Sequence, residues 1–156
     1  MRTLPKTDED YPPLLLVRTD YGDDAGWRRL RETLDHPWVF DERDGENGRL
    51  TEEILCVDDP RWEGAGVPEI LAALAAAAAE GGGETAEDAE CGWAVVFVAD
   101  AAGVRAQVPT LLAVSPDPEE TTEPYRIPAL ETPHAMHCNL ALANMDFQDF
   151  SGELSD

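Results

Sequence analysis

The sequence is poor in positive charge and especially in lysine. Its 156 residues include 11 Lys and Arg against 33 Asp and Glu, a formal net charge of −22 at pH 7, and Lys6 is the single lysine. A field this negative repels phosphate backbones and anionic lipid surfaces, so we expect no direct binding to nucleic acid or to a membrane. Cations and basic proteins are the favoured partners.

Long apolar runs and a cysteine framework are also missing. No stretch approaches the roughly 18 apolar residues that a membrane-spanning helix needs, and the first ten residues lack the apolar region of a signal peptide. Cys56, Cys91 and Cys138 are an odd number at wide spacings, which predicts reduced thiols rather than disulfides. We therefore expect a cytoplasmic protein.

Motifs of nucleotide chemistry are absent from the sequence. The three glycines at 81–83 follow a predicted helix, and neither the lysine nor the hydroxyl residue of a phosphate-binding loop comes after them. There is no dinucleotide-binding fingerprint and no internal repeat. The sequence therefore predicts no cofactor and identifies no catalytic residue, and enzymatic activity is the less favoured expectation.

Four short apolar runs are the most informative feature that is present, because each one leads to aspartate. The runs and their aspartates are 14–17 with Asp20, 54–57 with Asp58 and Asp59, 95–98 with Asp100, and 111–114 with Asp117. Runs of this length bounded by turn residues are typical of strands buried on both faces of a sheet. In open α/β sheets, ligands bind at the carboxyl ends of such strands.

Helical patterns lie between these runs. Trp27, Leu30 and Leu34 share one face of a helix that ends near 35, and a second helix extends from about 66 to 80. The order predicts an α/β fold: a single domain with a mostly parallel central sheet of four to five strands flanked by helices. The short link between the third and fourth runs is compatible with one antiparallel edge strand.

The domain is expected to span 13–154, after a polar N-terminal lead at 1–12. Acidic, turn-rich segments at about 81–90 and 116–124 are predicted to be flexible connectors, and 41–53 reads as a surface loop. Residues 125–128 are predicted to form an edge strand because they include a proline.

The strand-end aspartates are the candidate ligand or cation site. Gathered at one sheet edge, these carboxylates would repel one another, and Mg²⁺ or Ca²⁺ would relieve that repulsion. The candidates are Asp20, Asp58, Asp59 and Asp100. The alternative is that each aspartate caps the helix or turn that follows it. Phosphoryl chemistry is not expected, since such a site needs a lysine at a later strand end and the only lysine of the chain is Lys6.

A cluster of histidine and cysteine occurs near the C-terminal end. His134, His137 and Cys138 lie within five residues, but zinc requires four ligands and no second local pair is visible. We therefore expect ordinary loop residues here, with Cys138 in the core, and no metal site.

Aromatic residues beside acidic ones supply candidate contacts for a protein partner. Trp62, in a proline-containing loop, is predicted to be an exposed anchor. The other candidates form an acidic-aromatic surface near the end of the chain: Asp146, Phe147, Asp149 and Phe150. The competing interpretation is a C-terminal helix, starting near 144, that docks by its aromatic side chains.

Three segments carry a resemblance to a known family: 15–21 followed by Trp27, then 96–100, and most specifically 139–150. With these segments the chain resembles a family of small actinobacterial proteins described only as a domain of unknown function, number 6924. The resemblance extends from about Leu14 to Leu154. It implies a single domain and no known activity, cofactor or catalytic residue.

The functional hypothesis is a small acidic protein-binding module, in its most concrete form an immunity or antitoxin-type inhibitor of a basic partner. The alternative is a metal-dependent or small-ligand-binding α/β enzyme or sensor that uses the strand-end aspartates. Close convergence of Asp20, Asp58 and Asp100 would favour the alternative. Engagement of each one by a helix or turn N–H would favour the first hypothesis. The sequence does not indicate an oligomeric state.

Overall fold

The structure is a computed structural model that describes most of the predicted domain. The described residues are 4, 13–35, 38–39, 49–50, 54–80, 93, 95–116, 123–130, 132–141 and 147. The segment 81–90 and most of the lead at 1–12 lie outside them.

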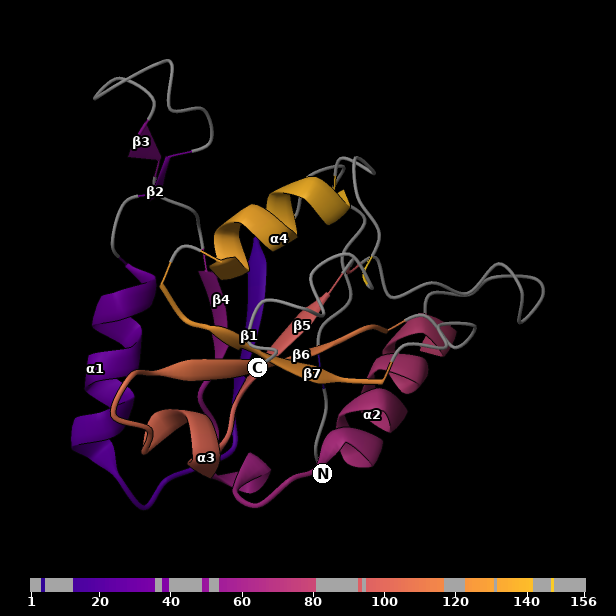
Figure 1. Ribbon diagram of the computed structural model, residues 1–156. Helices are drawn as coiled ribbons and strands as arrows, with labels where there is room; N and C mark the ends of the chain where they lie inside the picture. Colours follow the sequence, from indigo (N-terminus) through magenta and orange to yellow (C-terminus); the bar gives the residue numbers. More distant parts are fainter. Residues whose placement is uncertain are drawn as a thin grey trace.

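A five-stranded sheet forms the centre of the domain (Figure 1). Its strands are β1 (Leu14–Arg18), β4 (Ile54–Val57), β5 (Val96–Ala99), β6 (Thr110–Val114) and β7 (Tyr125–Pro128), in the order β4-β1-β5-β6-β7. β1 pairs in parallel with both β4 and β5, whereas β6 is antiparallel to β5 and to β7. The α/β fold with a parallel core is thus confirmed.

The antiparallel strand lies inside the sheet and not at its edge. The connection between β5 and β6 is residues 100–109, which include the four-residue helix α3 (Ala101–Val104). This is too short for a crossover, so the chain turns back beside β5. β7 then occupies the edge, as its proline predicts.

Helices cover both faces of the sheet. α1 (Asp24–Leu34) and α4 (Thr132–Ala141) lie on one face and α2 (Val67–Glu80) on the other (Figure 1). The 3-10 helix η2 (Pro60–Trp62) precedes α2, and β2 (Trp38–Val39) pairs with β3 (Arg49–Leu50) in a separate two-stranded sheet. β3 falls inside the segment that was predicted to be a loop.

The segment that holds the histidines is helical, and the loop prediction is wrong there. Proline is tolerated in a first helical turn, and Pro133 is the second residue of α4. His134 is buried, and its Nε2 donates a hydrogen bond of 2.7 Å to the Leu34 carbonyl at the end of α1. His134 therefore ties two helices together.

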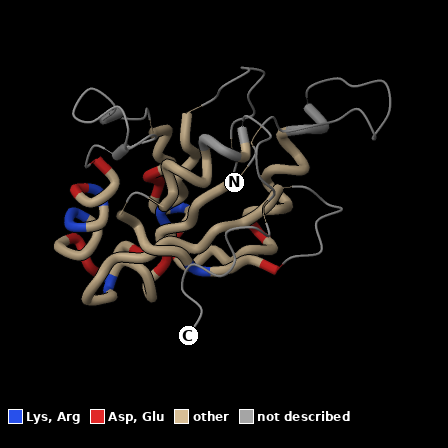
Figure 2. The backbone as a smooth tube through the Cα atoms, turned by 45° about the horizontal axis from the view of Figure 1, so that its top comes forward, with Lys and Arg blue, Asp and Glu red and all other residues tan. Residues whose placement is uncertain are grey.

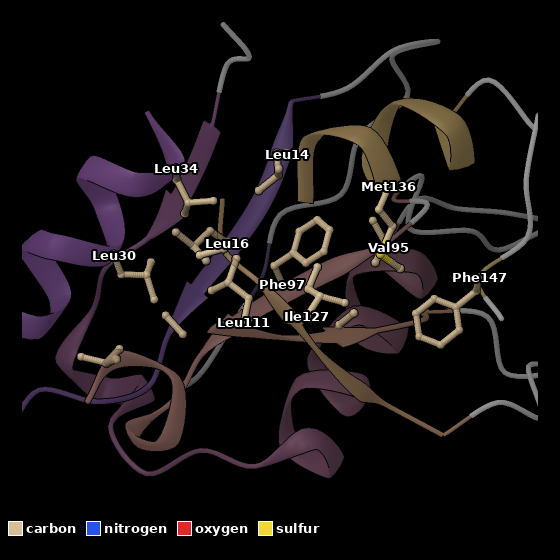
Figure 3. Close-up of a cluster of buried hydrophobic side chains, with 14 residues drawn as sticks. Leu14, Leu16, Leu30, Leu34, Val95, Phe97, Leu111, Ile127, Met136 and Phe147 are labelled. Carbon is tan, nitrogen blue, oxygen red and sulfur yellow. The ribbon is translucent and has the colours of Figure 1, made fainter. Parts of the chain in front are cut away.

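Alternate residues of the buried strands supply two separate cores. Leu14 and Leu16 of β1 point toward α1 and α4, and Leu15 and Val17 point toward α2. Figure 3 shows the first core, with Phe97 at its centre between helix and sheet residues. A three-layer sandwich follows, which is why the runs 14–17 and 96–99 are apolar on both faces of the sheet.

A glycine allows α1 to approach α3 closely. A Cβ atom on Gly26 would lie 2.4 Å from the Val104 carbonyl oxygen, well inside van der Waals contact. The backbone N–H of the same glycine donates 2.9 Å to Asp23 Oδ1, the N-cap of α1. Gly26 thus fixes the distance between the first turn of α1 and the end of α3.

Candidate functional site at the carboxyl edge of the sheet

Four predicted aspartates lie where β4, β1 and β5 end. We call this end of the strands the carboxyl edge of the sheet, as distinct from its outer strands β4 and β7. α3 and the first turn of α1 gather at the same edge (Figure 1). β6 runs in the opposite direction, since Val114 at its end pairs with Val96 at the start of β5. The fourth apolar run therefore leads toward the opposite edge, and Asp117 itself lies outside the described residues.

Asp20, which follows β1, is held by an arginine from beyond α3. Arg105 donates from Nε and from its terminal nitrogen to the two carboxylate oxygens, both at 3.1 Å, and the Gly22 N–H donates at 3.2 Å. Burial alone would raise the pKa of Asp20, but the Arg105 and Gly22 hydrogen bonds and the charges of Arg105 and Arg18 outweigh burial and lower it. Asp20 is thus a buried, ionised carboxylate with its own counterion.

Asp100, which follows β5, serves as a helix cap and as an ion-pair partner. As the N-cap of α3, its Oδ1 accepts a hydrogen bond of 3.0 Å from the Gly103 N–H. Arg126 of β7 donates two hydrogen bonds to the Asp100 carboxylate, at 3.0 and 2.7 Å, and one of 3.1 Å to Thr110 Oγ1. The pair links the ends of β5, β6 and β7.

Arg18, the last residue of β1, is a buried guanidinium at the centre of this edge. Its Nε donates 2.9 Å to the Asp20 carbonyl, and its terminal nitrogens pair with Asp24 at 3.0 Å and with Asp58 at 3.5 Å. The guanidinium carbon lies 4.2 Å from the ring centre of Tyr21 and 4.7 Å from that of Trp27. Asp58 is therefore paired with Arg18.

Two further titratable groups, Tyr21 and Cys56, lie near the charges of Arg18 and Asp58. Burial first, and then the neighbouring Asp58 carboxylate, raise the pKa of Tyr21. Burial also raises the pKa of the Cys56 thiol, although Arg31 beside it acts in the opposite direction. Both groups are accordingly neutral at pH 7.

Asp59 is engaged locally, by the residues that follow it. As the N-cap of η2, it accepts a hydrogen bond of 3.0 Å from the Arg61 N–H. Its Oδ2 also accepts hydrogen bonds of 3.0 and 2.7 Å from the Arg61 guanidinium. These contacts lie within two residues of sequence, as in an ordinary Asx turn.

The edge is thus a row of separate aspartate–arginine pairs. Each of the four candidate carboxylates has a guanidinium partner, and Asp59 and Asp100 also cap helices. Nowhere in the described ranges do three His, Cys, Asp or Glu side chains gather as metal ligands would. The repulsion that was expected to attract a cation is offset here by arginine.

The sequence interpretation identified the aspartates but missed their arginines. Arg105 and Arg126 are the only basic residues after residue 80, and both are paired with a strand-end aspartate. A charged residue at the end of an apolar run, as Arg18 is, was a second signal. Both signals were visible, but nothing in the sequence showed which arginine pairs with which carboxylate.

Two aromatic residues that were predicted to contact a partner, Trp62 and Phe147, are buried. Trp62 is 1% exposed and packs in the core on the α2 side, so its prediction as an exposed anchor is wrong. Phe147 is also buried, with its ring 4.8 Å from that of Tyr125, and the Tyr125 hydroxyl donates to its carbonyl. Both aromatics complete the core. Asp146, Asp149 and Phe150 lie outside the described residues.

Comparison with protein families gives one match across nearly the whole chain. The model of a domain of unknown function, DUF6924, matches residues 13–156. The chain belongs to the DUF6924 family. The match begins one residue before β1, which starts at Leu14. Comparison with curated proteins finds no match.

Charge is distributed unevenly along this DUF6924 chain. Residues 1–80 hold 19 acidic and 9 basic residues, and residues 81–156 hold 14 acidic and 2 basic ones. Blue and red positions are intermixed along α1, whereas most of α2 is tan (Figure 2). The second half of the chain therefore has the larger relative excess of negative charge. No described helix is long and apolar enough to span a bilayer.

Proposed function

We propose that this chain is a cytoplasmic, acidic protein-binding module whose partner is a basic protein. An immunity or antitoxin role, in which the chain inhibits a basic toxin, is its most concrete form. The observation that carries the proposal is the excess of negative charge: after residue 80 the sequence holds 14 acidic residues against Arg105 and Arg126, and both arginines are already paired with aspartate. Those carboxylates have few basic residues nearby in sequence to neutralise them.

The ion pairs within the fold support a role for the excess charge outside the fold's own stability. Arg18, Arg61, Arg105 and Arg126 are half of the described basic residues, and each is paired with aspartate. Their contribution is structural, because they join strand ends and helix starts. The formal charge of −22 is far larger than these few pairs can neutralise, and an excess of this sign attracts a positively charged surface.

The second candidate is a metal-dependent or ligand-binding enzyme or sensor at the carboxyl edge of the sheet. Its support is the position of Asp20 and Asp100 at the ends of neighbouring strands, where α/β sheets bind ligands. The bidentate arginine on each of them weighs against it, because a cation would have to displace both guanidinium groups.

The test is affinity capture from a lysate of the host at low and at high salt, followed by mass spectrometry of the retained proteins. A basic protein retained at low salt and released at high salt is the expected result. If no basic protein is retained at low salt, the proposal is contradicted. If, in addition, Mg²⁺ or Ca²⁺ raises the melting temperature of the protein, the second candidate is favoured.

A further inference from the structure

The strand β4 forms one edge of the main sheet, and its sequence does not protect that edge. No described strand pairs with its outer side, and its four residues, Ile-Leu-Cys-Val, include neither charge nor proline. Natural proteins usually protect edge strands with charges, prolines or a covering segment, because unpaired N–H and C=O groups invite further pairing. The opposite edge strand β7 has such protection, in Arg126 and Pro128.

The side chains of β4 are also only partly covered. Leu55 is 38% exposed, one of four large apolar side chains this exposed among the described residues, and its three neighbours in the strand are half-buried. By contrast, all five residues of β1, the adjacent strand, are buried. An added strand would cover Leu55 and Val57 on the α2 face and Ile54 and Cys56 on the α1 face.

Charges at the carboxyl end of β4 indicate which kind of segment fits there. Asp58, directly after the strand, has a side chain 46% exposed, and that of Asp24 is 81% exposed. Of the basic groups nearby, Arg18 is buried, Arg31 is half-buried, and Arg61, 62% exposed, is paired with Asp59. Because the Arg61–Asp59 pair cancels in charge, Asp24 and Asp58 make the exposed surface at this end negative.

From these observations we infer that the outer edge of β4 is the docking site for an extended segment of the basic partner, which adds to the sheet as a sixth strand. The segment has apolar residues beside Leu55 and lysine or arginine at the end next to Asp58. A second copy of this chain fits less well, because two molecules of formal charge −22 repel each other. The inference rests on the proposed function and names the surface that performs it.

The test uses the full-length chain and a synthetic peptide of alternating lysine and valine. A second peptide has the same sequence, but alternate backbone nitrogens are methylated so that it cannot pair as a strand. We expect the unmethylated peptide to bind at low salt and to slow hydrogen exchange at the β4 amides that face away from β1, one of each adjacent pair. The methylated peptide should bind at least about tenfold more weakly, because it cannot donate to the β4 carbonyls.

Two matched variants test the position of the site. Leu55→Glu and Leu71→Glu replace leucines of nearly equal exposure, 38% and 37%, and add the same charge. Leu55→Glu should weaken peptide binding about threefold to fivefold through the lost cross-strand contact. Leu71→Glu, in α2, should leave binding unchanged or strengthen it, because added negative charge attracts lysine.

The outcomes separate this inference from the proposed function. Equal binding of both peptides, abolished by salt, would overturn the β4 site and leave a basic partner in place. Failure of both peptides to bind at low salt would contradict the site and the function together. Self-association of the chain, with the β4 amides protected in the absence of peptide, would assign the edge to a second copy and overturn the inference.

Discussion

Arg105 donates two hydrogen bonds of 3.1 Å to Asp20, although 85 residues separate them in the sequence. The pair joins the loop after β1 to the end of α3, across the ends of the adjacent strands β1 and β5. In open α/β folds this is where a ligand usually enters. In this protein the Arg105 guanidinium occupies the Asp20 carboxylate at that position.

The first prediction concerns the acid stability that this pair provides. Because the pKa of Asp20 is lowered in the folded protein, its ionised form contributes stability above about pH 4, the range of an unfolded aspartate. That contribution is lost as the pH falls through the lowered pKa. Asp20→Asn should therefore reduce the free energy of unfolding at about pH 6 and have much less effect at about pH 3. Urea unfolding at the two pH values measures this, and an equal effect at both would contradict the assignment.

A second prediction concerns Gly26. Replacing a helical glycine with alanine ordinarily stabilises a protein by about 0.5–1 kcal/mol. Here the added Cβ would meet the Val104 carbonyl, so Gly26→Ala should instead destabilise by about 1–3 kcal/mol. Denaturant unfolding gives the sign directly. A stabilised variant would show that α1 and α3 are not in close contact.

A third prediction follows from the burial of Trp62. Trp62→Ala removes a side chain that is 1% exposed and should lower the free energy of unfolding by about 3–5 kcal/mol. The indole fluorescence of an exposed tryptophan is readily quenched by added iodide, whereas that of Trp62 should be protected. A variant at this position with unchanged stability would restore the interpretation of Trp62 as a surface anchor.

A fourth prediction concerns the double role of Asp100. Asp100→Ala removes the N-cap of α3 and the partner of Arg126, and a lost cap costs about 0.5–2 kcal/mol. Asp35→Ala, at an exposed aspartate after α1, is the matched control and should change stability by no more than about 0.5 kcal/mol. Similar thermal unfolding of the two variants would contradict a structural role for Asp100.

The sheet was predictable from the sequence because burial on both faces leaves a simple signal. The apolar runs at 14–17, 54–57 and 111–114 became β1, β4 and β6, and the run at 95–98 became β5, which starts at Val96. The reversal of β6 was expected only at an edge, because the pairing order depends on contacts that no local pattern records. α4 was missed since its apolar residues are mixed with histidine and asparagine, which weakens the helical periodicity.

The candidate site was predictable in position but not in chemistry. Parallel strands bring Asp20, Asp58 and Asp100 to one edge whatever their role. Their arginines come from loops and strands far away in the sequence, such as Arg126 of β7, and only the folded chain brings them together. Trp62 was misjudged because its charged and proline neighbours read as a surface loop, whereas the short helix η2 turns its ring into the core.

The most direct test of the account is the rate at which the chain associates with the basic partner recovered at low salt, measured over a range of ionic strengths. Electrostatic steering predicts an association rate that falls at least about tenfold from low to high salt, while the dissociation rate changes little. An association rate independent of salt would contradict the account. The charge of −22 would then serve to keep the protein soluble and would have no part in recognition.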